Sequence, residues 1–221
     1  LMIEVYRISL LQMMENAGLQ LASLARERFL DNDPLGKKVA VCCGTGGNGG
    51  GGLAAARRLH TWGAEVVLFL AKAPGDLSPI PAHQYRILEA LEIRTVLPGA
   101  VQISVETDLI LDALLGYSLV GNPRGEYARL IQVINSHPAP ILSLDNPSGL
   151  DPTSGELLDP CVRAEATLTL ALPKIGLVDD AARKAVGELY LADISVPPVL
   201  YRDIGIDVGP IFSRDQILRL I

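Results

Sequence analysis

Residues 38–53 read KVAVCCGTGGNGGGGL, and this stretch decides the fold class. Its first six residues form a short apolar run, typical of a strand that is buried on both faces of a sheet. A glycine-rich loop, residues 44–52, comes next, and the pattern from Leu53 to about Trp62 predicts a helix. Backbone N–H groups of such a loop approach an anion closely, and the following helix dipole adds attraction. The stretch therefore predicts a site for a phosphate-bearing nucleotide.

The glycine spacing fits a dinucleotide-binding fingerprint only in part. Gly44, Gly46 and Gly49 satisfy G-x-G-x-x-G between a strand and a helix. A flexible surface loop is the alternative, although so many glycines would then lose conformational entropy without any return. A dehydrogenase of this type carries an acidic residue after its second strand, whereas here residues 65–70 are followed by Ala-Lys72-Ala. An NAD(P)-dependent oxidoreductase is therefore disfavoured but stays open.

Strand and helix patterns alternate along the remainder of the chain. A capping box of Ser9 and Gln12 starts the first helix. Further helices are expected at 81–92 and 127–134, and further strands at 65–70, 94–97, 108–111, 140–144, 167–171 and 188–192. This order predicts an α/β fold, a Rossmann-like three-layer sandwich with a mostly parallel sheet and helices on both faces. No linker interrupts it, so residues 1–221 are expected to form a single domain.

Composition narrows the classes of function. The 221 residues are 49% hydrophobic and 20% charged, with a net charge of −6. No basic cluster is dense enough for nucleic acid, and no apolar run reaches the ~18 residues of a membrane helix. Cys42 and Cys43 should point to opposite faces of their strand, and with Cys161 they lack the spacing of a zinc site. The cysteines are expected to be small core residues in a reducing compartment.

Two carboxylates follow predicted strands. Asp112 ends the run from residue 108, and Asp145 ends the run from residue 140. In an open parallel sheet the carboxyl ends of the strands share one edge, where ligands bind. Either aspartate alone is also explained by a turn or a helix cap. Together with the glycine-rich loop, they favour a site at this edge.

Five separated motifs then carry a family resemblance. They are LQMMENAG at 11–18, the glycine-rich loop, LDALLG at 111–116, LDNPSGLD at 144–151 and LPKIG at 172–176. Over nearly the whole chain, the sequence resembles the YjeF N-terminal domain family, whose characterised enzymes are NAD(P)H-hydrate epimerases. The resemblance implies epimerisation of the R form of hydrated NADH or NADPH to the S form. It also implies a cytoplasmic location and functional pairing with a separate dehydratase, and it leaves a homodimer open.

The resemblance also implies specific residues. A potassium ion (K+) would be bound by Asn48, Asp112 and Ser148, all of which offer oxygen atoms. Asp145 would contact the substrate. Epimerisation needs proton transfer around the hydrated ring carbon, and the position of Asp145 at a strand end, beside the turn at residues 147–149, makes it our candidate for the catalytic acid and base. The other substrate contacts would be Gly47, Asn48, Gly49, Gly50, Gly51, Gly116, Tyr117, Ser118, Leu119, Val120, Gly121 and Asn122.

The glycine-rich loop departs from the family pattern at two positions. The family loop usually reads G-x-G-N-N-G-G-D-G, and this chain has Gly47 and Gly51 in place of the first Asn and the Asp. This departure motivates an alternative, a non-catalytic module that retains the nucleotide pocket without turnover. For either function, Gly49→Val is expected to abolish ligand binding without unfolding the protein, because a branched side chain would block the loop.

Overall fold

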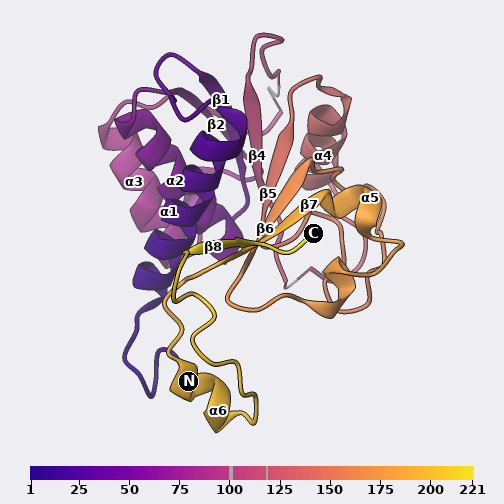
Figure 1. The fold of residues 1–221 in the computed structure, drawn as a ribbon. Coiled ribbons are helices and arrows are strands. Elements are labelled where there is room, and N and C mark those ends of the chain that lie inside the picture. Colours follow the sequence, from indigo (N-terminus) through magenta and orange to yellow (C-terminus); the bar gives the residue numbers. More distant parts are fainter. Residues whose placement is uncertain (100–101, 118) are drawn as a thin grey trace.

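The computed structural model describes residues 1–99, 102–117 and 119–221. An eight-stranded sheet runs through it in the order β3-β2-β1-β4-β5-β6-β7-β8. Neighbouring strands from β3 to β7 are parallel, and β8 pairs antiparallel with β7. Figure 1 shows α1, α2 and α3 on one side of the sheet and α4 on the other. The expected α/β sandwich with a mostly parallel sheet is confirmed.

The elements have the following bounds. The strands are β1 (Lys38–Cys43), β2 (Glu65–Leu70), β3 (Thr95–Val96), β4 (Leu109–Ala113), β5 (Ile141–Leu144), β6 (Ala166–Leu170), β7 (Glu188–Ala192) and β8 (Ile217–Arg219). The α-helices are α1 (Leu10–Phe29), α2 (Gly47–Thr61), α3 (Pro79–Ala90), α4 (Glu126–Ser136), α5 (Arg183–Val186) and α6 (Pro198–Asp203). Two short 3₁₀ turns are η1 (Pro74–Asp76) and η2 (Ile175–Leu177).

Successive side chains of a strand point to opposite faces of the sheet and so pack into two apolar cores, one on each face. In β1, Val39 and Val41 pack into the core under α1, α2 and α3. Cys42 joins the opposite core, which α4 covers, whereas Cys43 lies in the first. The two adjacent thiols therefore point to opposite faces, as predicted. Both are free and buried, and burial raises their pKa values, so they are inert core groups.

The strand order reverses at the centre of the sheet. The chain runs outward from β1 through β2 to β3, then returns to place β4 on the other side of β1. Ligands of open α/β sheets bind in the crevice beyond the carboxyl ends of the strands at such a switch point. The glycine-rich stretch after β1 and the end of β4 flank this crevice, so the fold brings the predicted motifs together.

The start of α2 differs from the sequence prediction. The helix begins at Gly47, within the glycine-rich stretch, and not at Leu53. Glycine has one of the lowest helix propensities, so the sequence pattern gave no reason to extend the helix this far. Packing overrides propensity here, since Gly49 to Gly52 are all buried.

Close approach to neighbouring elements explains these helical glycines. A Cβ atom built on Gly49 would lie 1.9 Å from the Gly44 carbonyl oxygen, which is backbone. On Gly50 it would meet the Met14 sulfur of α1 at 2.5 Å, and on Gly51 it would meet Leu144 Cδ2 at 2.7 Å. Three of the glycines thus permit tight packing of α2 against its surroundings.

The motif at 11–18 also has a structural role. The Glu15 carboxylate in α1 accepts hydrogen bonds from Arg57 and Arg58 of α2 and from Gln84 of α3. The Asn16 side chain donates to the Ile194 carbonyl at 3.2 Å. These contacts hold the three helices and the segment after β7 together. The predicted capping box of Ser9 and Gln12 is present at the start of α1.

Other differences are small or concern short elements. Asp112 lies within β4 and does not follow it, because the strand extends to Ala113. The sequence reading missed α5, α6 and β8, which have six residues or fewer. Among the described residues, no helix has both the length and the apolar character needed to span a bilayer.

Candidate functional site

A cavity of about 530 Å³ opens at the switch point of the sheet. The start of α2, the ends of β4 and β5 and the first turns of α1 form its walls. The lining residues are Leu10, Met13, Met14, Ala17, Thr45, Gly46, Gly47, Asn48, Leu114, Leu115, Gly116, Tyr117, Leu119, Val120, Tyr127, Leu144, Asp145, Leu170 and Ile194. Most of the side chains are apolar, and a few polar groups lie among them, as is usual for a small-molecule site.

The N-terminus of α2 faces this cavity. Its cap residue, Gly46, has no side chain to satisfy the first backbone N–H groups of the helix, and Gly47 and Asn48 in the first turn line the cavity. Uncapped N–H groups at the positive end of a helix dipole bind anions. This wall of the cavity is therefore suited to a phosphate or diphosphate group.

Asp145 provides a carboxylate on another wall. It follows β5 directly and has a φ of +66°, in the left-handed region that Asp tolerates better than most residues. Its Oδ1 accepts hydrogen bonds from the Leu170 amide at 3.3 Å and from the Lys174 ammonium group. The left-handed backbone of Asp145 and these two contacts fix the orientation of its carboxylate at the end of β5.

Asp112 is completely buried and is not among the residues that line the cavity. Oδ1 accepts hydrogen bonds from the Ser148 hydroxyl at 2.6 Å and the Leu114 amide at 3.2 Å. Oδ2 accepts from the Ser143 hydroxyl at 2.8 Å and the Ser148 amide at 2.9 Å. Burial raises the pKa of the Asp112 carboxyl, while these hydrogen bonds oppose the rise.

The three residues predicted to bind potassium meet around Leu115. The Asn48 amide nitrogen donates to the Leu115 carbonyl at 3.2 Å, and the Leu115 amide donates to the Ser148 hydroxyl at 2.8 Å. Ser148 in turn donates to Asp112. Among the described residues, no cationic side chain forms an ion pair with Asp112. Two hydroxyl groups and two backbone N–H groups therefore donate to the buried Asp112 carboxylate. Asp112 and Ser148 offer the oxygen atoms that a hard monovalent cation binds, whereas Asn48 would have to turn its amide oxygen, in place of its nitrogen, toward the ion.

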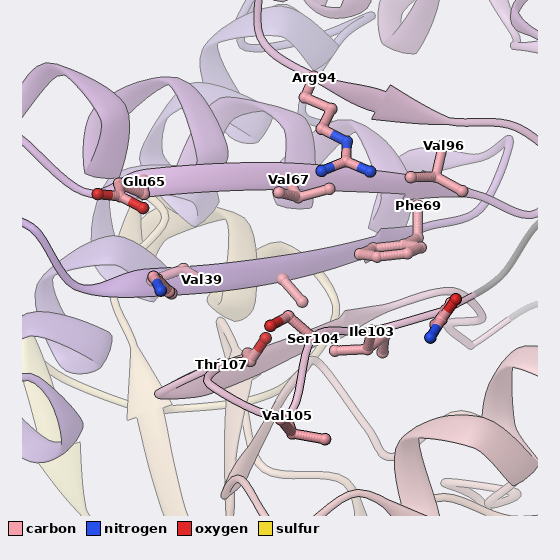
Figure 2. A pocket seen from close by; sticks show the side chains of 13 residues that line it. Val39, Glu65, Val67, Phe69, Arg94, Val96, Ile103, Ser104, Val105 and Thr107 are labelled. Carbon is pink, nitrogen blue, oxygen red and sulfur yellow. The ribbon is translucent and has the colours of Figure 1, made fainter.

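A second cavity, of about 620 Å³, lies elsewhere on the sheet. Figure 2 shows its side chains, which come from β1, β2, the region of β3 and the segment 102–107. They include Val39, Val67, Phe69, Arg94 and Thr107. This cavity includes residues at the amino ends of β1 and β2, and none of the predicted site residues that the structure describes lines it. The smaller cavity at the carboxyl ends is therefore the candidate site.

Comparison with known proteins identifies the family. Residues 10–176 match the family described as YjeF-related protein N-terminus, which is three quarters of the chain. The chain belongs to this YjeF-related family. A protein of Dehalogenimonas lykanthroporepellens named NAD(P)H-hydrate epimerase is 44% identical over 198 residues, covering 90% of this chain and 78% of that protein. An epimerase of Cenarchaeum symbiosum is 37% identical, with 84% and 85% covered.

Some relatives in the YjeF-related family are longer. A bifunctional NAD(P)H-hydrate repair enzyme of Pyrobaculum aerophilum is 37% identical over 199 residues, and the chain spans 38% of its length. A crystal structure of a yeast protein superposes with a TM-score of 0.80 at 24% identity, covering 99% of this chain and 94% of that one. The likeness to the yeast protein shows the fold.

The substrate contacts predicted from the family resemblance differ in where the structure places them. Seven of the substrate-contact candidates line the cavity: Gly47, Asn48, Gly116, Tyr117, Leu119, Val120 and Asp145. Gly49, Gly50 and Gly51 do not, because they pack within α2. Gly121 and Asn122 also lie outside the lining, and the Asn122 side chain accepts a hydrogen bond from the Asp159 amide. Ser118 lies outside the described residues.

The two departures from the family loop have different surroundings. Gly47 lines the cavity, and among the described residues a Cβ there would have only Met14 Cε within 4 Å, at 3.9 Å. Gly51 faces Leu144, which fills the space that a side chain at 51 would need. The change at 47 thus removes a side chain from the cavity wall, whereas the change at 51 is accommodated by packing.

Sequence reasoning missed several residues of the site. Leu10, Met13 and Met14 of α1 line the cavity, and none of them was among the predicted site residues. Tyr127 lies close to Thr45, with its hydroxyl 3.3 Å from the threonine hydroxyl. Lys174, in the motif at 172–176, contacts Asp145. The motif itself was the only signal for Lys174.

Proposed function

We propose that this chain is an NAD(P)H-hydrate epimerase, which converts the R form of hydrated NADH or NADPH to the S form. The observation that carries the proposal is one cavity with an uncapped helix N-terminus on one wall and the Asp145 carboxylate on another. A nucleotide substrate needs the first for its diphosphate, and epimerisation at the hydrated ring carbon needs the second for proton transfer. The names of the similar proteins support the same function.

The proposed position of the substrate follows from the polar and apolar groups that line the cavity. The diphosphate binds the backbone N–H groups at the start of α2, near Gly47 and Asn48. The hydrated ring lies beside Asp145, and the side chains of Leu10 and Met13 cover apolar parts of the nucleotide. Gly49, Gly50 and Gly51 support the helix N-terminus from within, and Gly116, Tyr117, Leu119 and Val120 line a further part of the cavity. In this arrangement the carboxylate can take up and return a proton at the reacting centre.

Potassium is proposed to bind through Asn48, Asp112 and Ser148. The ion would supply the positive charge that the buried Asp112 carboxylate lacks, and it would tie the start of α2 to the loops after β4 and β5. Asp112 is the only one of the three with a full charge, which suits a monovalent ion. Among the described residues, no cluster of three His, Cys, Asp or Glu side chains offers a site for a transition metal.

Potassium is expected to raise the melting temperature more than sodium does at matched ionic strength. Binding to the folded state alone stabilises by mass action, and sodium is smaller and more tightly hydrated. In a chain of this size, each ~1 kcal/mol of differential binding shifts the melting temperature by about 2–4 °C. Thermal melts in the two chlorides measure the difference, and general screening would act equally in both.

Asn48→Ala is the sharper variant for this experiment. Asp112→Ala also removes a proposed ligand, but it would leave the donors of Ser143, Ser148 and Leu114 unpaired in the interior and destabilise the fold by itself. Asn48→Ala should abolish the difference between the salts, whereas Asn122→Ala, outside the ligand set, should preserve it. Identical melts of the unmodified chain in both salts would contradict the ion site.

Two assays separate the proposal from its rivals. Loss of absorbance at about 340 nm with NADPH and a carbonyl substrate would indicate an oxidoreductase, since hydride transfer consumes the reduced ring. Chromatography of hydrated NADPH follows the conversion of R to S. Conversion supports the epimerase, and tight nucleotide binding without either reaction supports the non-catalytic module.

The remaining assignments extend the proposal. We propose one domain over residues 1–221, a cytoplasmic location and functional pairing with a separate dehydratase. The bifunctional names of longer relatives motivate the pairing. A homodimer is the proposed assembly to test by sedimentation.

A further inference from the structure

The Lys174 ammonium group is held by three acceptors. It donates to Asp145 Oδ1, to the Thr169 hydroxyl at 2.9 Å and to the Leu170 carbonyl at 3.0 Å. An ammonium group has three N–H donors, so this set satisfies all of them. The side chain is 22% exposed and that of Asp145 is 15% exposed, which limits screening of the pair by water. The group is therefore fixed in position and in orientation.

The two oxygens of Asp145 have different environments as a result. Oδ1 accepts from Lys174 and from the Leu170 amide. Oδ2 has no hydrogen-bond partner among the described residues, and Asp145 lines the cavity. Lys174 is not among the lining residues, so it reaches the cavity only through Asp145. One oxygen is thus occupied by the protein and the other is available to a ligand.

We propose that Lys174 is the positioning residue of the reaction, holding Asp145 Oδ1 so that Oδ2 is the atom that exchanges the proton with the substrate. This inference rests on the proposed epimerase function. Oδ2 takes the proton of the ring hydroxyl group and passes it to the ring nitrogen as the bond between that nitrogen and the hydroxyl-bearing carbon breaks, which leaves an aldehyde. The reverse transfers close the ring on the other face of the aldehyde, so no oxidant or reductant is consumed. Fixing a general base in one orientation lowers the activation free energy because less freedom is lost in the transition state.

A purely structural role is the competing explanation. The ion pair joins the end of β5 to the segment after β6, and removing it could simply loosen that segment. A structural role would affect stability, or kcat and KM together, and an added amine would not repair it. A positioning role would lower kcat selectively, because substrate binding relies on other walls of the cavity.

Three variants of Lys174 test the proposal. Lys174→Met keeps the length without the charge, Lys174→Arg keeps the charge, and Lys174→Ala leaves space for a small amine. Lys174→Met should lower kcat roughly 10- to 100-fold with KM changed less than about threefold, as for a misplaced catalytic group. Lys174→Arg should retain more activity than Lys174→Met, and methylammonium should restore part of the turnover of Lys174→Ala. Lys184→Met, at an exposed position of α5, is the control and should behave as the unmodified chain.

Crystal structures of the unmodified chain and of Lys174→Met provide a readout that is independent of turnover. The Asp145 carboxylate should rotate away from its orientation when Lys174 is absent. An unmoved carboxylate, or unchanged kcat in Lys174→Met, would overturn the positioning role, as would a loss confined to KM or melting temperature. If the unmodified chain shows no epimerisation, the proposed function fails, and the orientation of Asp145 in the two structures still decides the role of Lys174.

Discussion

Asp145→Asn is expected to lower turnover by roughly 10²- to 10⁴-fold, the usual contribution of a general acid or base. The amide keeps the size and shape of the side chain but cannot take up the proton. Asn tolerates the left-handed backbone at this position, and its carbonyl oxygen can still accept from Lys174, so the fold should persist. Rate measurements, nucleotide titration and a thermal melt together separate catalysis from binding and stability.

Asp180→Asn provides the control for this variant, because Asp180 is exposed and lies outside the cavity. It should match the unmodified chain in all three measurements. The nucleotide affinity of Asp145→Asn should change little, since the diphosphate binds at the start of α2. Near-normal turnover in Asp145→Asn would mean that another group carries the proton.

Gly49→Val is expected to destabilise the fold by about 3 kcal/mol or more, at or above the upper end of typical overpacking. Its Cβ would lie 1.9 Å from the Gly44 carbonyl oxygen and 2.7 Å from the Gly44 carbonyl carbon. Both are backbone atoms, so the backbone between β1 and α2 would have to move. The sequence prediction that this variant stays folded and only loses its ligand is therefore replaced. Denaturant unfolding monitored by circular dichroism measures the loss.

The matched control is Gly47→Val, in the same helix. Within the part of the chain that the structure describes, only Met14 Cε lies within 4 Å of a Cβ at Gly47, so the variant should fold. Its side chain would enter the cavity wall and lower nucleotide affinity, which is the effect first expected of Gly49. Similar unfolding midpoints for Gly49→Val and the unmodified chain would contradict the packing described for α2.

Local sequence patterns predicted those helices and strands that are marked by the periodicity of their apolar residues or by a capping residue. Apolar runs located β1 and β2 within their bounds, and Ser9 marked the start of α1. The start of α2 could not be predicted, because the glycines are helical only through contacts with distant residues such as Met14 and Leu144. Short β8 was missed for a similar reason, since its pairing with β7 defines it.

The candidate site was predictable in its strand-end carboxylates and less so elsewhere. Asp145 follows a buried strand. The carboxyl ends of parallel strands meet at one edge of the sheet, so the sequence places Asp145 at that edge, where ligands bind. The contact between Lys174 and Asp145 crosses from one strand connection to another, and no spacing rule relates the two residues. The apolar wall that α1 contributes could not be predicted, because apolar residues recur at the same spacing on a helix face that lines a cavity and on one that packs in the core.

The rate of epimer conversion tests the account most directly. The R form of hydrated NADPH is incubated with the unmodified chain, with Asp145→Asn and with buffer, and the two epimers are separated by chromatography over time. The account predicts that S forms in proportion to the amount of unmodified chain, at a rate well above that in buffer, while Asp145→Asn stays close to the buffer rate. Formation of S at the buffer rate with the unmodified, nucleotide-binding chain would contradict the epimerase function.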